Sequence, residues 1–203
     1  MKIRLGMSPI SWSNDDLPQL GGETPLEVCL AETRQAGFTG TENGGKFPTE
    51  AGALKSVLDD HDLVLVSGWY SGTVINNDLA AEIEQITPQL TLFRDVGAPV
   101  IVYGETYETV QNRKERPLAS RPKLADFDVA AYGRRLTALA EHCADFGVPL
   151  TFHHHMGTAV EHEAEIDQLM NHTGEAVNLL LDTGHLLFAG GDNAAVIAKY
   201  GSR

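Results

Sequence analysis

The sequence predicts an α/β fold of the (β/α)8 TIM-barrel type, with about six of the strand–helix units of such a barrel present. Short apolar runs alternate with helical patterns along the 203 residues. Glycine-containing turns join helical patterns to the apolar runs that follow them, as in Ala36-Gly37-Phe38, Val96-Gly97-Ala98 and Phe146-Gly147-Val148. Polar residues stand at the predicted carboxyl ends of many strands, where a barrel places its active site: Glu42, Trp69, Glu105, His153, His155 and Asp182.

A doubly wound open sheet is the alternative arrangement of the same units. If such a sheet bound a dinucleotide, it would need a Gly-rich phosphate-binding turn directly after its first strand. The residues at that place, Ser8-Pro9-Ile10-Ser11, do not form one. The polar residues at many strand ends therefore favour the barrel.

The first half of the chain supplies three units. We expect strands over residues 3–7, 38–42 and 63–67, and the third, which is continuously apolar as in a strand buried on both faces, runs on to Gly72. A helix opens with Thr24 as its N-cap and Pro25 as its first residue, and it stops at Gly37. The helix of the third unit carries apolar residues at helical spacing: Ile83, Ile86, Leu90, Phe93 and Val96.

The second half supplies three more units, with strands expected over residues 99–103, 150–155 and 177–182. A polar loop from Gly104 to about Asp126 follows the first of them, and loops of that length in a compact domain are usually functional or mobile. Helices are expected over about 129–146, in the glutamate-rich stretch after the fifth strand, and from about Asp192.

The number of units creates a problem for the barrel. A complete barrel has eight units and typically ~250 residues. We therefore expect residues 1–203 to form a single incomplete domain, because a barrel sheet with about six strands leaves two unpaired edges. Either the chain is a shortened form of a longer protein, or the barrel closes through another copy of the chain as a homo-oligomer.

Composition and charge exclude several classes of function. The formal net charge of -13 argues against a nucleic-acid partner, which needs Lys and Arg to neutralise phosphates. Cys29 and Cys143 form no metal-spaced pair and are typical of core residues in a reducing compartment. The N-terminus resembles a strand and not a signal peptide, and no stretch approaches the ~20 apolar residues of a membrane span. We expect a cytoplasmic protein with no membrane partner.

Three consecutive histidines follow the apolar start of the fifth strand. Side chains alternate along a strand, so His153 and His155 share one face with Thr151, while His154 lies on the face of Leu150 and Phe152. Two imidazoles that reach one point are typical of a metal site or of acid–base chemistry. Histidines that are merely hydrogen-bonded or exposed are the structural alternative.

A second informative stretch is Leu181-Asp182-Thr183-Gly184-His185. Alternation places Asp182 on the face opposite Leu179 and Leu181, so Asp182, His153 and His155 would point into the barrel mouth together. A carboxylate with imidazoles on neighbouring strands makes part of a site for Mn²⁺, Co²⁺, Fe²⁺ or Zn²⁺. Alternatively, Asp182 is only a cap or turn residue.

Together, five stretches resemble the myo-inosose-2 dehydratases (2-keto-myo-inositol dehydratases) of the xylose isomerase-like TIM-barrel superfamily: residues 8–16, 37–42, 46–48, 153–158 and 181–185. The resemblance covers the chain from its first strand to its last residue. It implies dehydration of 2-keto-myo-inositol to a trihydroxycyclohexane-1,2-dione in bacterial inositol catabolism, with Mn²⁺ or Co²⁺ and glutathione as cofactors.

The resemblance also implies roles for single residues. Asp182 matches the superfamily's metal aspartate, His185 matches a histidine that contacts substrate oxygens, and His153 stands where the superfamily commonly has a metal-binding glutamate. The superfamily's two further metal ligands would lie beyond Arg203. In the mechanism that follows, the metal stabilises an enolate, and the candidates for base and acid are His155 and His185, with Glu42 as a substitute.

The predicted substrate contacts are Lys46, for cyclitol hydroxyls, and Trp12, Trp69 and Tyr70, which would cover the apolar face of the ring. A solvated Lys46 and tryptophans in packing roles are the alternatives, as is Glu105 as a loop cap. For the whole protein, the alternatives are a sugar or keto-sugar isomerase or epimerase of the same superfamily, and a non-catalytic fragment. The acidic charge argues against a role like that of endonuclease IV.

Overall fold

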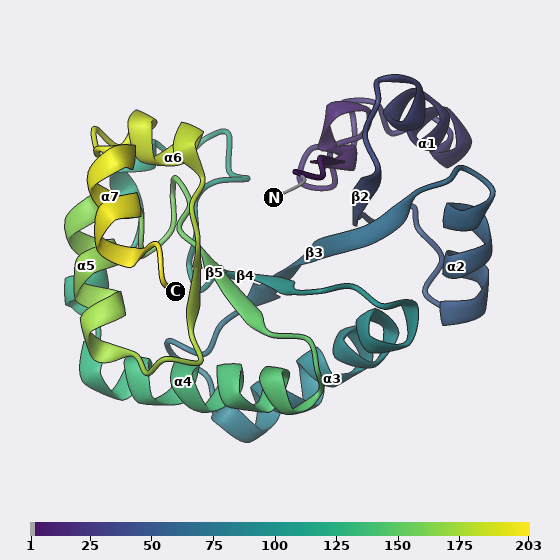
Figure 1. The fold of residues 1–203 in the computed structure, drawn as a ribbon. Coiled ribbons are helices and arrows are strands. Elements are labelled where there is room, and N and C mark those ends of the chain that lie inside the picture. Colours follow the sequence, from purple (N-terminus) through teal and green to yellow (C-terminus); the bar gives the residue numbers. More distant parts are fainter. Residues whose placement is uncertain (1–2) are drawn as a thin grey trace. The chain divides into compact units, whose positions relative to one another are not determined.

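The computed structural model describes residues 3–203, which form six strands in one sheet in the order β1-β2-β3-β4-β5-β6 (Figure 1). The pairs β1–β2, β2–β3 and β5–β6 are parallel. The strands are β1 (Gly6–Met7), β2 (Gly40–Asn43), β3 (Val64–Gly72), β4 (Ile101–Glu105), β5 (Leu150–His153) and β6 (Asn178–Leu180). Parallel pairing of successive strands with helices between them confirms the predicted α/β fold.

Seven α-helices lie among the described residues: α1 (Leu26–Gln35), α2 (Ala51–Asp59), α3 (Leu79–Val96), α4 (Val129–Asp145), α5 (Glu163–His172), α6 (Thr183–Phe188) and α7 (Asn193–Tyr200). Short 3-10 helices cover η1 (Pro9–Ser11), η2 (Leu118–Ser120) and η3 (Leu124–Asp126). In this part of the chain no helix is long and apolar enough to span a membrane.

Three local predictions were wrong. Strand β1 is shorter than expected, because Ile3 and Leu5 are 76% and 59% exposed and no burial fixes them in the sheet. Thr24 does not cap α1; the cap is Pro25, and the Thr24 carbonyl accepts a hydrogen bond from Lys46 Nζ. Helix α6 begins directly after Asp182, whereas the next helix was expected only from about Asp192.

The chain divides into two compact units. The first extends to Trp69 and includes residues 88–101. Its core contains Leu30, Leu54, Leu65 and Phe93, all at most 3% exposed. Gly68 lets the Phe93 ring approach β3 closely, since a Cβ at Gly68 would lie 2.6 Å from Phe93 Cζ.

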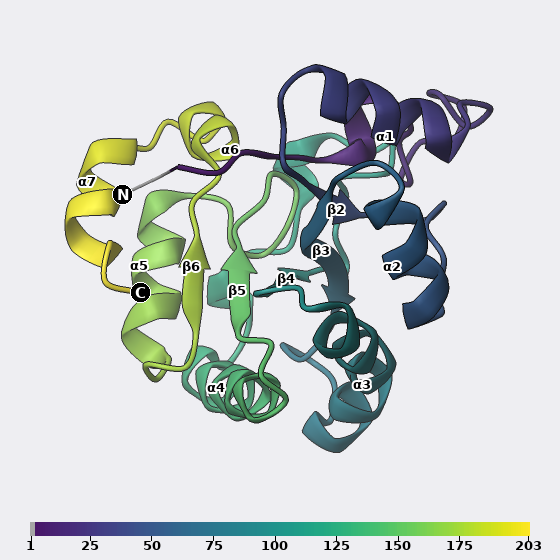
Figure 2. The ribbon, with the colours of Figure 1, turned by 45° about the vertical axis from the view of Figure 1, so that its right-hand side comes forward.

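The second unit contains residues 70–87 and 102–203. Leu150 and Phe152 of β5 are buried, whereas Thr151 and His153 are partly exposed, so the predicted alternation along this strand is confirmed. Strands β5 and β6 lie side by side with α5 alongside, as both views show (Figures 1 and 2). The Phe152 ring lies 6.0 Å from that of Tyr103, and these aromatic side chains form part of the unit's core.

Two buried carboxylates organise the segment after β3. Glu82 accepts hydrogen bonds from the Tyr70 hydroxyl (3.2 Å) and from the Thr73 backbone (3.1 Å). Glu105 accepts from the Tyr103 hydroxyl and the Ile75 backbone, both at 3.0 Å. Glu105 is thus a loop cap, which the sequence left as the alternative to a role in the site, and its exposed fraction is 1%.

Gly133 on α4 sets how closely α5 can pack. Alanine normally stabilises a helix interior by about 1 kcal/mol over glycine. A Cβ at Gly133, however, would lie 2.1 Å from the backbone oxygen of His172, so the helices would have to separate. We expect Gly133→Ala to lower the free energy of unfolding by ~1–3 kcal/mol in urea denaturation. The exposed neighbour Arg134→Ala should change it by less than ~0.5 kcal/mol. A Gly133→Ala variant as stable as the parent would contradict this packing.

Glu105 should make stability depend on pH. Burial raises the pKa of this carboxyl from 4.5 to about 8, so the folded chain keeps a proton that the unfolded chain releases between these values. The contribution of Glu105 to the free energy of unfolding therefore falls as pH rises through this window. Relative to the parent, Glu105→Gln should gain stability between pH 5 and 8, by up to ~1.4 kcal/mol per pH unit. Denaturation curves at several pH values test this, with the exposed Glu84→Gln as control. Parallel stability curves for Glu105→Gln and the parent would refute it.

Candidate active site

The second unit gathers four histidines and a carboxylate at the carboxyl ends of β5 and β6. His153 is the last residue of β5, His154 and His155 follow it, Asp182 follows β6, and His185 lies in α6. His153 Nε2 is 3.5 Å from Asp182 Oδ2, and His185 Nε2 is 4.0 Å from the same oxygen. The rings of His155 and His185 are 3.9 Å apart between centroids. The predicted convergence of His153, His155 and Asp182 is therefore confirmed.

His154 lies on the other face of the chain, as predicted, and is fully buried. Its Nε2 accepts a hydrogen bond from the backbone N–H of Asp182 (3.3 Å), so the proton of the neutral ring is on Nδ1. Burial lowers the pKa of His154 to about 4, which keeps the ring in this neutral state. His154 therefore holds the backbone of Asp182 while its neighbours face the cluster.

Asp182 combines the two roles that the sequence left open. Its Oδ1 caps α6 by accepting from the backbone N–H of His185 (2.7 Å), and its Oδ2 faces His153 and His185. The hydrogen bond with His153 is the main cause that lowers the pKa of Asp182, and the N–H of His185 adds to it. The carboxylate is therefore charged at neutral pH.

His155 and His185 are predominantly neutral at neutral pH. Burial lowers the pKa of His155 to about 4 and lowers that of His185 as well. His155 Nδ1 lies 2.7 Å from the carbonyl oxygen of Met156, which can only accept, so Nδ1 carries the proton and Nε2 is the basic nitrogen. Neutral imidazole is the form that binds metals and acts as a general base.

Three of these residues form a donor set for a metal ion. Single donor atoms of His153, Asp182 and His185 all lie within 4.8 Å of one another. Two imidazoles and a carboxylate fit the intermediate divalent ions Mn²⁺, Co²⁺, Fe²⁺ and Zn²⁺. The structure thus places His185, which was expected as an acid or base in contact with substrate oxygens, beside the predicted ligands His153 and Asp182.

Three of the other predicted residues lie in the first unit with polar partners of their own. Glu42 accepts from Ser67 Oγ (2.7 Å), and the Trp12 indole donates to Glu32. Lys46 Nζ donates to the carbonyl oxygens of Gly21 and Thr24. The catalytic role of Glu42 and the substrate roles of Trp12 and Lys46 stay predictions.

The two aromatic residues predicted on β3 differ in burial. Trp69 is partly exposed in the first unit, and its carbonyl accepts from Gln89 (3.0 Å). Tyr70 is buried in the second unit, where it donates to Glu82, and its pKa is raised chiefly by burial. Their substrate roles also stay predictions.

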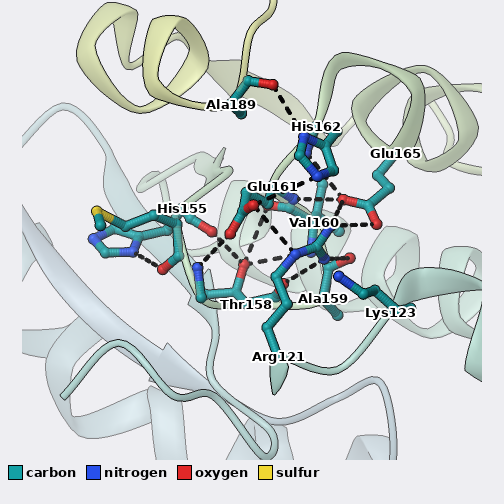
Figure 3. A network of polar contacts seen from close by, with 12 residues as sticks. Arg121, Lys123, His155, Thr158, Ala159, Val160, Glu161, His162, Glu165 and Ala189 are labelled. Carbon is teal, nitrogen blue, oxygen red and sulfur yellow. Dashed lines mark hydrogen bonds and ion pairs between the residues drawn. The ribbon is translucent and has the colours of Figure 1, made fainter. Parts of the chain in front are cut away.

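The sequence did not predict the buried ionic network that is shown in Figure 3. Arg121, from the polar loop after β4, pairs with Glu161 and Glu165 at the start of α5. No spacing in the sequence marks these residues as partners. The only signal was the length of the loop that carries Arg121.

Asp182 provides a direct test of the donor set. Asn caps helices about as well as Asp but lacks the charge, so Asp182→Asn should keep α6 and weaken the site. We expect the affinity of the chain for Mn²⁺ or Co²⁺ to fall by at least ~10-fold in calorimetric titration. Asp192→Asn is the matched control, because Asp192 caps α7 outside the cluster. Equal metal affinity in Asp182→Asn and the parent would exclude Asp182 as a ligand.

Comparison with known proteins identifies the family of the chain. Residues 30–203 match the family model "Xylose isomerase-like TIM barrel". The whole chain is 51% identical to a rhizopine catabolism protein, MocC, from Rhizobium meliloti, of which it spans 62%. It is 36% identical to an inosose dehydratase from Geobacillus thermodenitrificans, with all of this chain aligned to 68% of that protein.

Solved structures show the same fold. An L-ribulose 3-epimerase superposes on 98% of this chain and 67% of its own with a TM-score of 0.70 and 20% identity. The probable 3-DHS dehydratase AsbF from Bacillus anthracis covers 98% of this chain and 70% of its own, with a TM-score of 0.67 and 16% identity. At these identities the likeness establishes the fold alone. The chain therefore belongs to the xylose isomerase-like TIM barrel family, with a partial barrel fold, and within it to the family of the inosose dehydratases.

Proposed function

We propose that the protein is a metal-assisted hydro-lyase that dehydrates 2-keto-myo-inositol to a trihydroxycyclohexane-1,2-dione in inositol catabolism. The observation that carries the proposal is the convergence of His153, His155, Asp182 and His185 at the ends of two neighbouring strands. Membership in the family of the inosose dehydratases supports the substrate. The chain spans about two thirds of the length of these relatives, 62% of one and 68% of another, so activity of the 203-residue chain is part of the proposal.

The cofactor proposed is Mn²⁺ or Co²⁺. His153, Asp182 and His185 would hold the ion, which supplies Lewis-acid polarisation of the substrate ketone when bound. The glutathione dependence implied by the family resemblance stays a prediction.

His155 is proposed as the general base. Its Nδ1 is committed to the Met156 carbonyl, so its Nε2 is the nitrogen that takes the proton from the carbon beside the ketone. Its low pKa fits a base that is unprotonated before the reaction begins.

His155 is also proposed as the general acid: its protonated ring returns the proton that it took from carbon to the departing β-hydroxyl, which leaves as water. The predicted acid role of His185 stays a prediction, because His185 belongs to the proposed metal donor set.

The direct experiment incubates the 203-residue chain with 2-keto-myo-inositol and Mn²⁺ or Co²⁺ and follows the ultraviolet absorbance of the conjugated product. Metal-dependent absorbance with loss of water in mass spectrometry is expected, and chelation should abolish it. A product isomeric with the substrate would instead indicate an epimerase or isomerase. No conversion by metal-loaded chain would contradict the proposal. A rhizopine is the second compound to assay, because the relative at 51% identity is named for its catabolism.

His155→Gln separates the base from the metal ligands. His155 is outside the donor set, so this variant should retain metal affinity within ~3-fold while kcat falls by about 10²- to 10⁴-fold. The control is His172→Gln, an exposed histidine on α5, which should keep the parental kcat. Unchanged kcat in His155→Gln would show that another group removes the proton.

A further inference from the structure

Arg121 is the only arginine or lysine among residues 3–203 that is buried; its exposed fraction is 4%. It comes from the polar loop after β4, and Figure 3 shows its guanidinium surrounded by acceptors of the segment after β5. We propose that Arg121 is a positioning residue that fixes the loop Met156–Glu161 and thereby sets the orientation of His155.

The guanidinium distributes its donors over two kinds of acceptor. Nη1 donates to the carbonyl oxygens of Thr158 (2.9 Å) and Ala159 (3.4 Å). Nη2 donates to both carboxylate oxygens of Glu165 (2.9 and 3.0 Å), and Nε lies 3.3 Å from Glu161 Oε1. A planar fork makes this set of contacts, and the single ammonium of lysine does not reproduce it.

The two carboxylates in turn hold backbone N–H groups of the same loop. Glu161 accepts from Gly157 (2.6 Å), and Glu165 accepts from the N–H groups of Glu161 and His162, both at 2.9 Å. Arg121 therefore fixes the backbone of the loop in two ways: it binds the carbonyl oxygens directly, and it holds the N–H groups through Glu161 and Glu165.

The loop directly controls the backbone of His155. The N–H of His155 donates to the Val160 carbonyl (3.1 Å), and the His155 carbonyl accepts from Thr158 Oγ (2.8 Å). The Met156 carbonyl, which fixes the tautomer of the ring, belongs to the same loop. Each main-chain group that orients His155 thus belongs to a residue that Arg121 contacts or to one within two positions of it in the sequence.

The network also reaches the helix that carries His185. His162 Nδ1 lies 3.1 Å from the carbonyl oxygen of Ala189, which caps α6 (Figure 3). Burying one cation with two carboxylates is a poor way to gain stability, because apolar residues of equal volume often serve as well. The effect of the buried Arg121 is therefore geometric. It fixes the loop that carries His155, whose ring centroid lies 3.9 Å from that of His185.

The test follows the tautomer of His155 in metal-free protein labelled with ¹⁵N-histidine. Long-range ¹H–¹⁵N spectra of the parent should show the Nδ1–H form at His155, assigned by its absence in His155→Gln. In Arg121→Lys and Arg121→Met this signal should become a mixture of the two tautomers. Arg135→Lys is the matched control, because Arg135 binds the carbonyls of Val74 and Ile75 in the same unit and should leave His155 unchanged.

Thr158→Val removes the hydroxyl that binds the His155 carbonyl and the Val160 backbone, and it tests whether this loop orients His155 if the Arg121 variants do not fold. A His155 signal that stays in the Nδ1–H form in the folded Arg121 variants, or in Thr158→Val when those do not fold, would overturn the proposal.

A kinetic measurement rests on the proposed function. Arg121→Lys should lower kcat by about 10-fold or more with KM changed by less than ~2-fold, because a misplaced base affects the transition state and not binding. An equal loss in Arg135→Lys, or an unchanged kcat in Arg121→Lys, would count against the positioning role. If the parent shows no dehydration, the proposed function fails, and the tautomer of His155 alone decides the role of Arg121.

Discussion

Asp182 divides its two carboxylate oxygens between a helix and a cluster of imidazoles. Oδ1 receives the N–H of His185 and starts α6, while Oδ2 faces the Nε2 atoms of His153 and His185. The same cap that begins the helix therefore brings His185 onto the carboxylate. His154 holds the backbone of Asp182 from the opposite face. The donor set depends on this residue for its charge and for its geometry.

The electrostatics around Asp182 favour a cation. Burial lowers the pKa of His154, His155 and His185, so these three imidazoles are neutral at neutral pH. The Asp182 carboxylate is charged, because the hydrogen bond with His153 lowers its pKa. A divalent ion would supply the positive charge that protonated imidazoles do not, and nitrogen donors select intermediate ions over Mg²⁺ or Ca²⁺.

Much of the fold and of the candidate site could be predicted from the spacing of residues along the sequence. Strand alternation placed His153 and His155 together and His154 apart, because the period of a strand is fixed by its backbone. The family followed from short motifs around the same residues. Helix α6 was not predicted, because a helix of six residues is too short to show a helical period in the sequence. The network of Arg121 joins residues some 40 positions apart in sequence, and only the folded chain brings them together.

Roles that depend on long-range packing were the hardest to infer. Tyr70 lies near the end of β3 and Glu105 is the last residue of β4, as expected of site residues, yet both are buried. Tyr70 donates a hydrogen bond to Glu82, and Glu105 accepts one from Tyr103. The register of β2 on β3 shifts between Thr41 and Glu42, so simple alternation along β3 does not predict the face that Tyr70 occupies.

The most direct test of the central claim is the pulsed electron paramagnetic resonance spectrum of Mn²⁺ bound to the chain labelled with ¹⁵N-histidine. Coordination by His153 and His185 predicts hyperfine coupling from two directly bound imidazole nitrogens. Bound Mn²⁺ that shows no coupling to ¹⁵N would contradict the account.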